Sequence, residues 1–300
     1  MDGAVLVIAA NEKVPQPQTR EHLLAIQMLG TKQIVIAQNK VDLVSDAEAK
    51  ANYSNIKSFV AGTFAENAPI IPLSAQHKLN IDALLQAIDE NIKIAQRDPN
   101  APPMMQVLRS FDVNKPGSVI QSLKGGVLGG TLLQGVFNSG DEIEIRPGLA
   151  DEKSRYEPVY TKVASLVTGA GITETVKPGG LIAVGTELDP FLTKSDALVG
   201  SLIGRPNELP PVHETMNVDT QLFDLAVGAP EMIKVEKIKA GEALRLNVGT
   251  SVTLGVVSST KDSSIHLKLR RPVCAPKGCR VAISRRIGER WRLIGSGTIS

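Results

Sequence analysis

The fold of the first third of the chain is decided by Gln33-Ile34-Val35-Ile36-Ala37-Gln38-Asn39-Lys40-Val41-Asp42, a short apolar run that ends in polar residues. The apolar and largely β-branched residues 34–37 predict a strand buried on both faces, as in a parallel sheet. Asn39, Lys40 and Asp42 follow at its carboxyl end, where ligands bind in open α/β sheets. The sequence therefore predicts a ligand-binding loop at this strand end.

The side chains of this loop suit a guanine base. A carboxylate at Asp42 can accept two hydrogen bonds, and guanine presents its N1–H and 2-amino donors side by side, an edge that adenine lacks. Asn39 can hold the loop by bridging neighbouring backbone groups, and the stem and ammonium of Lys40 can lie over the base. Taken alone, these residues are equally compatible with a polar turn after a strand.

A second apolar strand, Pro69-Ile70-Ile71-Pro72-Leu73, predicts the other half of the pocket. It ends in Ser74, Ala75 and Gln76, where small residues let backbone N–H groups approach a base carbonyl such as guanine O6. Two consecutive buried strands that each end in half of a guanine pocket, with a helical stretch between them, are typical of a GTPase. The predicted guanine-binding residues are Asn39, Lys40, Asp42, Ser74, Ala75 and Gln76.

Length and composition indicate a multidomain protein. A chain of 300 residues favours two or three domains, and a hydrophobic content of 42% is sufficient for real cores. No apolar run approaches the about 20 residues of a membrane span, and the first residues do not resemble a cleavable leader, so a cytoplasmic location is expected. Cys274 and Cys279 have no second pair and no histidine at ligand spacing, which favours ordinary thiols over a metal site.

The charge is unevenly distributed along the chain. Residues 261–300 contain ten Lys and Arg residues against two acidic ones, a net charge of +8, so a chain of net charge +2 carries −6 over residues 1–260. A basic end indicates contact with nucleic acid, and Arg285 and Arg286 are the candidate RNA-contacting residues. The alternative is that these charges form the solvated outer face of a β-barrel.

The periodicity predicts an α/β part followed by all-β parts. Residues 1–97 alternate strand and helix three times, which is half of a doubly wound domain, with helix starts expected at Thr19, at Ser45 or Asp46, and at Asn80. Residues 104–204 and 212–300 read as two β-barrels of short strands, separated by proline-rich linkers. Residues 118–123 are expected to be a strand, and Gly125–Gly130 a close barrel turn and not a phosphate-binding loop.

This plan resembles the translational GTPases, the group that includes elongation factor Tu. Over essentially the whole chain, the sequence is similar to the gamma subunit of archaeal and eukaryotic translation initiation factor 2. The stretches that carry the resemblance are residues 2–12, 15–23, 109–117, 123–127, 140–148, 282–286 and 290–295. It implies a partial G domain, of the kind that has a phosphate loop, followed by two β-barrels.

The resemblance also implies a function. The family delivers methionylated initiator tRNA to the small ribosomal subunit in a GTP-dependent manner, and its gamma subunit is the core of a heterotrimer with alpha and beta subunits. The implied activity is that of a protein-synthesizing GTPase, with GTP and Mg²⁺ as cofactors. A tRNA-carrying factor of the elongation factor Tu or selenocysteine type, and a non-hydrolysing β-barrel scaffold for partner subunits, remain as alternatives.

Two family motifs are not found in this sequence. It contains no Gly-Lys dipeptide, with which the family's phosphate loop ends, and no Asp-x-x-Gly. The resemblance places both motifs, the magnesium ligands and the catalytic residues upstream of the equivalent of Met1, which reads as an internal methionine. We therefore expect the chain alone to bind GTP weakly, and residues 1–97, with an open apolar sheet edge, to be sensitive to proteases.

Overall fold

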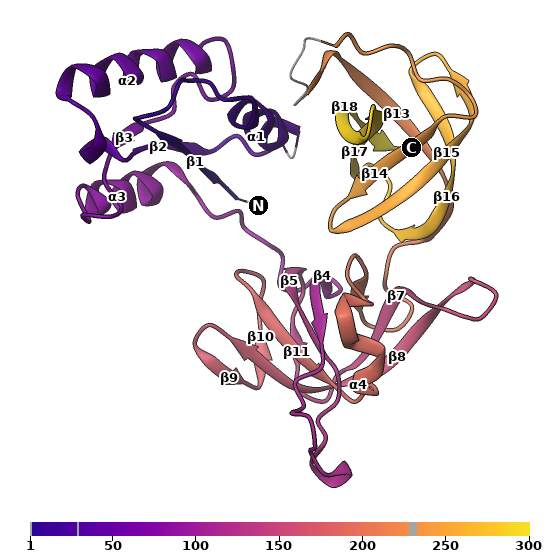
Figure 1. The fold of residues 1–300 in the computed structure, drawn as a ribbon. Helices are drawn as coiled ribbons and strands as arrows, with labels where there is room; N and C mark the ends of the chain where they lie inside the picture. The colour runs from indigo at the N-terminus through magenta and orange to yellow at the C-terminus, as the bar shows by residue number, and fades with distance from the viewer. Residues whose placement is uncertain (1, 29, 228–232) are drawn as a thin grey trace. The chain divides into compact units, whose positions relative to one another are not determined.

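The computed structural model describes residues 2–28, 30–227 and 233–300. Met1, on which the expectation of an internal start falls, lies outside the described residues. The chain forms two compact units, one comprising Met1–Gln96 with Phe223–Val235 and the other Arg97–Leu222 with Glu236–Ser300 (Figure 1). The sequence-based division into domains at 1–97, 104–204 and 212–300 stays a prediction.

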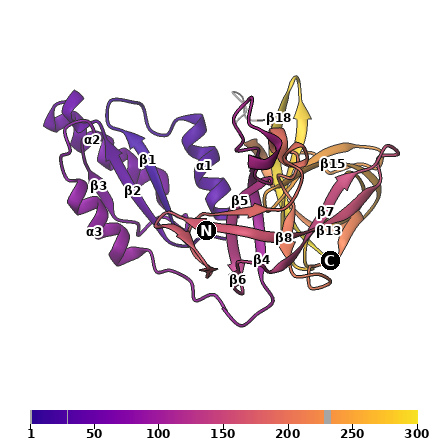
Figure 2. The same cartoon turned by 90° about the horizontal axis from the view of Figure 1, so that it is seen from below.

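The first unit contains a parallel sheet flanked by helices. Its strands lie in the order β1-β2-β3 and pair in parallel, with Ala4 opposite Ile34 and Ile36 opposite Ile70. Figures 1 and 2 show helices on both sides of this sheet. The elements are β1 (Ala4–Ala9), α1 (Pro17–Met28), β2 (Ile34–Asn39), the 3-10 helix η1 (Val41–Leu43), α2 (Asp46–Val60), β3 (Ile70–Pro72) and α3 (Ile81–Asn91).

Strand β2 is buried on both faces, as its apolar sequence predicts. Val35 and Ile36 point to opposite faces and are both fully buried. The core on one face gathers side chains from β1, β2, α1 and α2, among them Ile8, Leu23 and Ile56. Strand β1 is an edge of the sheet, and the side chain of Val7 on its other face is 58% exposed. Among the residues that the structure describes, β1 is thus an edge strand that carries an exposed apolar side chain.

Local side-chain chemistry determines where helix α2 begins. The Ser45 side chain accepts a hydrogen bond from the backbone N–H of Glu48, and the Glu48 carboxylate accepts one from the backbone N–H of Ser45 at 2.8 Å. This reciprocal capping box satisfies two backbone donors that have no partner inside the helix. Helix α1, in contrast, begins at Pro17, two residues before the predicted cap at Thr19, because proline fits the first turn of a helix without loss of a hydrogen bond.

Replacing Ser45 by alanine should lower the free energy of unfolding of the first unit by about 1 kcal/mol, because an N-cap acceptor is lost. The matched control is Ser54→Ala on the same helix, where an exposed hydroxyl bonds only the Lys50 carbonyl. The control should be neutral or stabilising by at most about 0.7 kcal/mol. Urea unfolding followed by the helical circular dichroism signal measures both, since α1, α2 and α3 lie in this unit. Equal losses in the two variants would refute the capping role.

The second unit begins with a sheet of seven strands in the order β11-β5-β4-β12-β7-β8-β9, in which β11 also pairs with β8. Its core includes Met105, Phe137, Ile143 and Ile203, all fully buried. Its main strands are β4 (Met104–Phe111), β5 (Val127–Gln134), β7 (Glu142–Ala150), β8 (Tyr156–Thr168), β9 (Gly171–Thr173), β11 (Ile182–Thr186) and β12 (Leu202–Gly204). The minor elements are β6 (Phe137–Asn138), β10 (Thr175–Val176), α4 (Pro190–Thr193) and η3 (Lys194–Asp196).

Two sequence-based predictions in this sheet are wrong. The strand predicted at 118–123 is a region with a 3-10 turn, η2 (Ile120–Ser122). The predicted turn at Gly125–Gly130 is largely strand β5, which agrees with the strand that the sequence also predicts at 127–137, and Gly130 in it lies close to neighbouring backbone. A Cβ atom on Gly130 would lie 1.9 Å from the Gln106 carbonyl oxygen, so the glycine allows two strands to approach and does not mark a reversal.

A closed barrel has the strand order β13-β16-β15-β14-β17-β18, and all of its strands except the end of β13 from Phe223 onward belong to this unit. Alternate residues such as Leu244 and Leu246 fill its interior. Its strands are β13 (Val212–Val227), β14 (Ala243–Val248), β15 (Ser251–Lys261), β16 (Ser264–Cys274), β17 (Arg280–Ile287) and β18 (Arg290–Ile299). The combination of a parallel α/β sheet with two β-barrels confirms the fold class predicted from the sequence.

Candidate functional site

The two predicted loops meet at the carboxyl ends of β2 and β3, which are neighbours in the sheet. Asn39 is the last residue of β2, and Lys40 adopts a left-handed backbone conformation (φ 64°) that turns the chain into η1. Asp42 lies within η1. The backbone N–H of Val41 donates to the carbonyl of Leu73 at 3.3 Å, so both loops leave the sheet from one point.

Asn39 joins the two loops directly. Its Oδ1 atom accepts a hydrogen bond from the backbone N–H of Lys40 at 2.8 Å and another from the backbone N–H of Ala75 at 3.0 Å. The bridging role that the sequence predicts for Asn39 thus spans 36 residues of chain. Lys40, Ala75 and Gln76 are exposed around this junction, which leaves them accessible to a ligand.

The carboxylate of Asp42 lies beside the second loop, with its side chain 22% exposed. Hydrogen bonding from the Ser74 side chain is the main cause that holds the pKa of Asp42 below its usual value of 3.8, and the Asp42 backbone N–H and the nearby His77 act in the same direction. Partial burial opposes them and does not reverse the shift. The Asp42 carboxylate is therefore ionised at neutral pH and can act as a double acceptor.

His77 is a neighbour of the site that the sequence analysis missed. Its Nε2 atom lies 3.7 Å from Oδ2 of Asp42, and its side chain is 67% exposed. It reaches this place because residues 74–79 form a closed loop, in which Ser74 and Leu79 exchange backbone hydrogen bonds. Its position one residue beyond Gln76 was the only signal in the sequence.

The start of helix α3 helps to hold the second loop. Asn80 occupies the predicted cap position but makes no capping bond with its side chain. Instead, its Nδ2 atom donates to the carbonyl of Pro72 at 2.8 Å, which ties the helix start to the end of β3. The predicted cap is therefore right in position and wrong in mechanism, because the strand carbonyl offers Asn80 a competing partner.

A buried amide pair supports the first loop from below. Gln38 is 1% exposed, and its Nε2 atom donates to Oδ1 of Asn52 at 2.9 Å and to the Ala49 carbonyl at 2.8 Å. Asn52 in turn donates to the carbonyl of Glu12 at 3.2 Å. This network fixes the end of β2 to helix α2 and to the segment after β1. Sequence reasoning missed it because a lone glutamine and a lone asparagine have no distinguishing pattern.

The predicted RNA-contacting arginines have different surroundings. Arg285 is 17% exposed, and its guanidinium is bound within the barrel to the carboxylate of Glu242 and to the carbonyl of Glu236 at 2.9 Å. Arg286, the next residue, is exposed. The two arginines are therefore not equivalent, and their contact with RNA stays a prediction.

The two cysteines make no contact with the candidate site that the structure shows among its described residues. Burial raises the pKa of Cys274 to about 12, and its thiol donates to the Pro210 carbonyl at 3.2 Å. Within the described ranges, no group of three or more His, Cys, Asp or Glu side chains could hold a metal ion. No helix among the residues that the structure describes is long and apolar enough to cross a membrane.

Comparison with protein families and with curated relatives gives consistent matches. A family described as "Initiation factor eIF2 gamma, C terminal" matches residues 214–299, and one described as "Elongation factor Tu GTP binding domain" matches residues 1–94. Translation initiation factor 2 subunit gamma of Archaeoglobus fulgidus is 57% identical over 299 residues, which cover 100% of this chain and 70% of that protein. The subunit of the same name from Methanocaldococcus jannaschii is 56% identical over 100% of this chain and 74% of its own length.

Solved structures share the fold at much lower identity. The apo form of translation elongation factor SelB from Methanococcus maripaludis has a TM-score of 0.78 at 21% identity, covering 100% of this chain and 66% of that chain. A bacterial selenocysteine-specific elongation factor EF-Sec has a TM-score of 0.76 at 21% identity, covering 99% of this chain and 44% of that chain. This chain thus spans less than two thirds of the length of those proteins.

Proposed function

This chain belongs to the family of translation initiation factor 2 gamma subunits, which are translational GTPases, and we propose that residues 39–42 and 74–76 are its guanine-recognition loops. The observation that carries the proposal is the hydrogen bond from the Ala75 backbone N–H to Oδ1 of Asn39, which holds the two loops beside one another. A flat base placed between the loops meets Asp42 along one edge and the 74–76 backbone at its carbonyl.

Each loop residue has a distinct role in this proposal. The ionised Asp42 accepts hydrogen bonds from N1–H and the 2-amino group of guanine, and the Lys40 side chain covers one face of the base. Backbone N–H groups near Ala75 and Gln76 receive O6, while Ser74 acts on Asp42 and stays buried. Adenine presents an acceptor at N1 and has no 2-amino group, so it faces the Asp42 carboxylate with no donor. The loops therefore discriminate between the two purines.

The relatives support a place in translation initiation. We infer that this chain contributes to GTP-dependent delivery of methionylated initiator tRNA to the small ribosomal subunit in the cytoplasm, in assembly with alpha and beta subunits. The relatives at 56–57% identity are named initiation factor subunits, whereas the elongation factors match at 21% and share the fold alone. Co-purification of the chain with alpha and beta subunits tests the assembly; association with neither would contradict it.

Magnesium is not assigned to the residues described. A Mg²⁺ ion with GTP neutralises phosphate charge when bound, and it needs oxygen ligands in near-octahedral geometry. The described residues contain no cluster of acidic or histidine side chains that fits this requirement. The role proposed for residues 39–42 and 74–76 is recognition of the base.

We expect the 300-residue chain to bind GTP with a dissociation constant in the millimolar range or weaker. Two charge-assisted hydrogen bonds to Asp42 contribute about 3–6 kcal/mol, whereas association costs about 4–15 kcal/mol. The deficit is normally made up by contacts with phosphates, which the six loop residues do not provide. Titration of the purified chain with fluorescent GTP measures this affinity. A dissociation constant in the micromolar range or tighter would contradict the expectation.

A further inference from the structure

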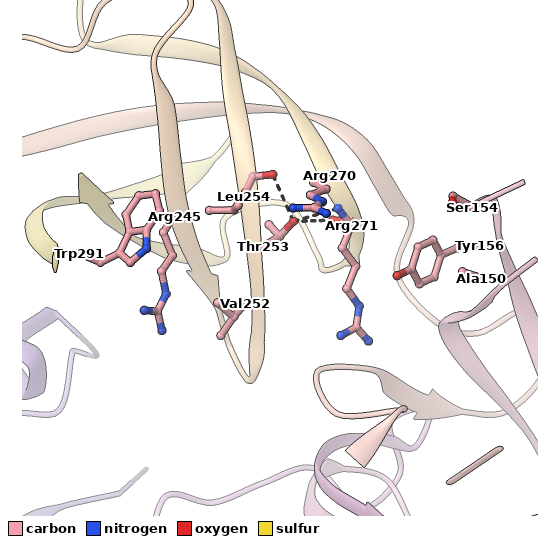
Figure 3. A pocket seen from close by; sticks show the side chains of 10 residues that line it. All are labelled: Ala150, Ser154, Tyr156, Arg245, Val252, Thr253, Leu254, Arg270, Arg271 and Trp291. Atoms are coloured by element: carbon pink, nitrogen blue, oxygen red, sulfur yellow. Dashed lines mark hydrogen bonds between the residues drawn. The ribbon is translucent and has the colours of Figure 1, made fainter. Parts of the chain in front are cut away.

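A cavity of about 540 Å³, open to solvent, lies between the closed barrel and the hairpin that joins β7 to β8. Both belong to the second compact unit. The cavity volume falls within the range of about 300–1,000 Å³ that is typical of small-molecule sites. Figure 3 shows the side chains that line it, which include Tyr156, Arg245, Thr253, Arg270, Arg271 and Trp291.

The cavity is strongly positive. Three arginines line it, and no carboxylate stands among the described residues of its wall. Within the described part of the chain, the side chains of Arg245 and Arg270 make no hydrogen bond or ion pair. Arg271 donates from Nη2 to the carbonyl of Val199 at 2.9 Å, but its buried Nε atom has no partner. A buried N–H without an acceptor is costly, so an anion that supplies one would be stabilised here.

Several arginines elsewhere in the same unit, in contrast, are paired with carboxylates. Four of them reach a carboxylate within 3.0 Å or less, and these pairs are Arg109 with Asp196, Arg146 with Glu144, Arg155 with Asp151, and Arg285 with Glu242. The unit thus has acidic partners available for its other arginines. Three guanidinium groups around one cavity repel one another unless a ligand brings negative charge. The missing counter-charge therefore points to an anionic ligand.

Aromatic and hydroxyl groups shape the same cavity. The Arg271 guanidinium lies 5.9 Å from the centre of the Tyr156 ring, a cation–π contact that holds it toward the hairpin. Thr253 exchanges two hydrogen bonds with the Arg271 backbone, which fixes the position of that residue (Figure 3). Trp291 is half-buried at the other side of the cavity and offers an indole face. Arginine forks suit phosphate oxygens, and an indole face suits a nucleobase.

We propose that this cavity binds a nucleotide, either free or as part of a single-stranded RNA, with the phosphate held by Arg245, Arg270 and Arg271 and the base stacked on Trp291. The site is separate from the guanine-recognition loops. It holds the base by stacking and makes no hydrogen bonds to the edge of the base. It therefore accepts adenine nucleotides, which the loops at Asp42 reject. This difference allows the two sites to be tested independently.

The test is a titration of the 300-residue chain with ADP and with single-stranded oligoadenylate, followed by the fluorescence of Trp291, the only tryptophan. We expect quenching by at least one of the two probes. Arg245→Gln should weaken the binding about tenfold or more, since a charge-assisted contact is lost. Arg205→Gln, an equal change of charge at an exposed residue outside the cavity, should leave the binding within about twofold. Arg245→Lys, which keeps the charge and loses the fork, should give an intermediate affinity.

The outcomes are distinct. Binding of ADP and oligoadenylate with similar affinity identifies a free nucleotide as the ligand, and binding of oligoadenylate alone identifies single-stranded RNA. No quenching by either probe would overturn the proposal, as would equal weakening by Arg245→Gln and Arg205→Gln. Equal competition by polyglutamate would also overturn it, because the cavity would then bind any polyanion. An unchanged circular dichroism spectrum in each variant excludes loss of folding as the cause.

Discussion

Replacing Glu144 by alanine should lower the free energy of unfolding of the second unit by about 3–5 kcal/mol, because it leaves the half-buried Arg146 guanidinium, the Tyr160 hydroxyl and the Asn207 N–H without their shared acceptor. Glu144 is fully buried, and its Oε1 atom accepts a hydrogen bond from Nε of Arg146 at 2.6 Å. The hydroxyl of Tyr160 donates to the same oxygen at 3.0 Å, and the backbone N–H of Asn207 donates to Oε2 at 2.8 Å. One carboxylate therefore ties β7, β8 and the segment after β12 together.

Strand β7 offers a matched control in Glu142, two residues away. Its side chain is 70% exposed, and its oxygen lies 3.7 Å from Nζ of Lys162, so Glu142→Ala should cost no more than about 1 kcal/mol. Urea unfolding followed by Trp291, which lies in the same unit, measures both variants. Losses that agree within about 0.5 kcal/mol would show that Glu144 does not anchor this unit.

Replacing Asp42 by asparagine should reverse the base preference of the candidate site. The asparagine amide turns an N–H donor toward the 2-amino group of guanine, so at least one charge-assisted hydrogen bond is lost. The guanine affinity should fall about 10- to 100-fold, since such a bond is worth about 1.5–3 kcal/mol. Xanthine carries an oxygen in place of the 2-amino group, and its nucleotide should bind the variant more tightly than GTP does.

The control for this variant is Asp46→Asn, which removes an exposed carboxylate at the start of α2. Asp46→Asn should keep the preference for guanine. Ligand-observed NMR at millimolar nucleotide concentrations compares GTP and XTP on the two variants and the parent chain. A preference for guanine that survives in Asp42→Asn would contradict the role assigned to this carboxylate.

The retained negative charge of Asp42 also determines how guanine binding should depend on pH. Because the pKa of Asp42 lies below 3.8 in the folded chain, the carboxylate remains ionised as the pH falls from about 7 to about 5. The stabilisation that it provides is present above the unfolded pKa and is lost only as the pH falls through the lowered folded value. Loss of guanine affinity between about pH 7 and pH 5 would therefore have to arise from another group.

The features that were predicted best from the sequence are those that depend on the pattern of residues close together in the chain. The apolar residues of β2 predicted a strand that is buried on both faces, and the helix start predicted at Ser45 or Asp46 agrees with α2, which begins at Asp46 with Ser45 as its cap. The bridging role of Asn39 followed from its donor and acceptor groups at a strand end. For β2 and α2 a few neighbouring residues determine the outcome, whereas the bond from the Ala75 backbone N–H to Asn39 spans 36 residues, and only the bridging chemistry of Asn39 could be read from the sequence.

Features that depend on contacts between distant residues could not be read in the same way. Glu144 looks like any acidic residue in an alternating strand, and its burial depends on Asn207, 63 residues away. Gly130 was misread as part of a turn because its tight approach to Gln106 exists only once the strands pair. Arg285 was selected for its charge, although Glu242 engages that charge within the barrel. Such pairings are fixed by topology.

The measurement that tests the central claim most directly is a titration of the isotope-labelled chain with guanosine and with adenosine monophosphate, followed by backbone amide NMR. The two loops are joined at Asn39 and Ala75, so the amides of Lys40, Asp42 and Ala75 should shift together with guanosine monophosphate and remain unchanged with adenosine monophosphate. Shifts confined to one loop, or equal shifts with both nucleotides, would contradict a shared guanine pocket.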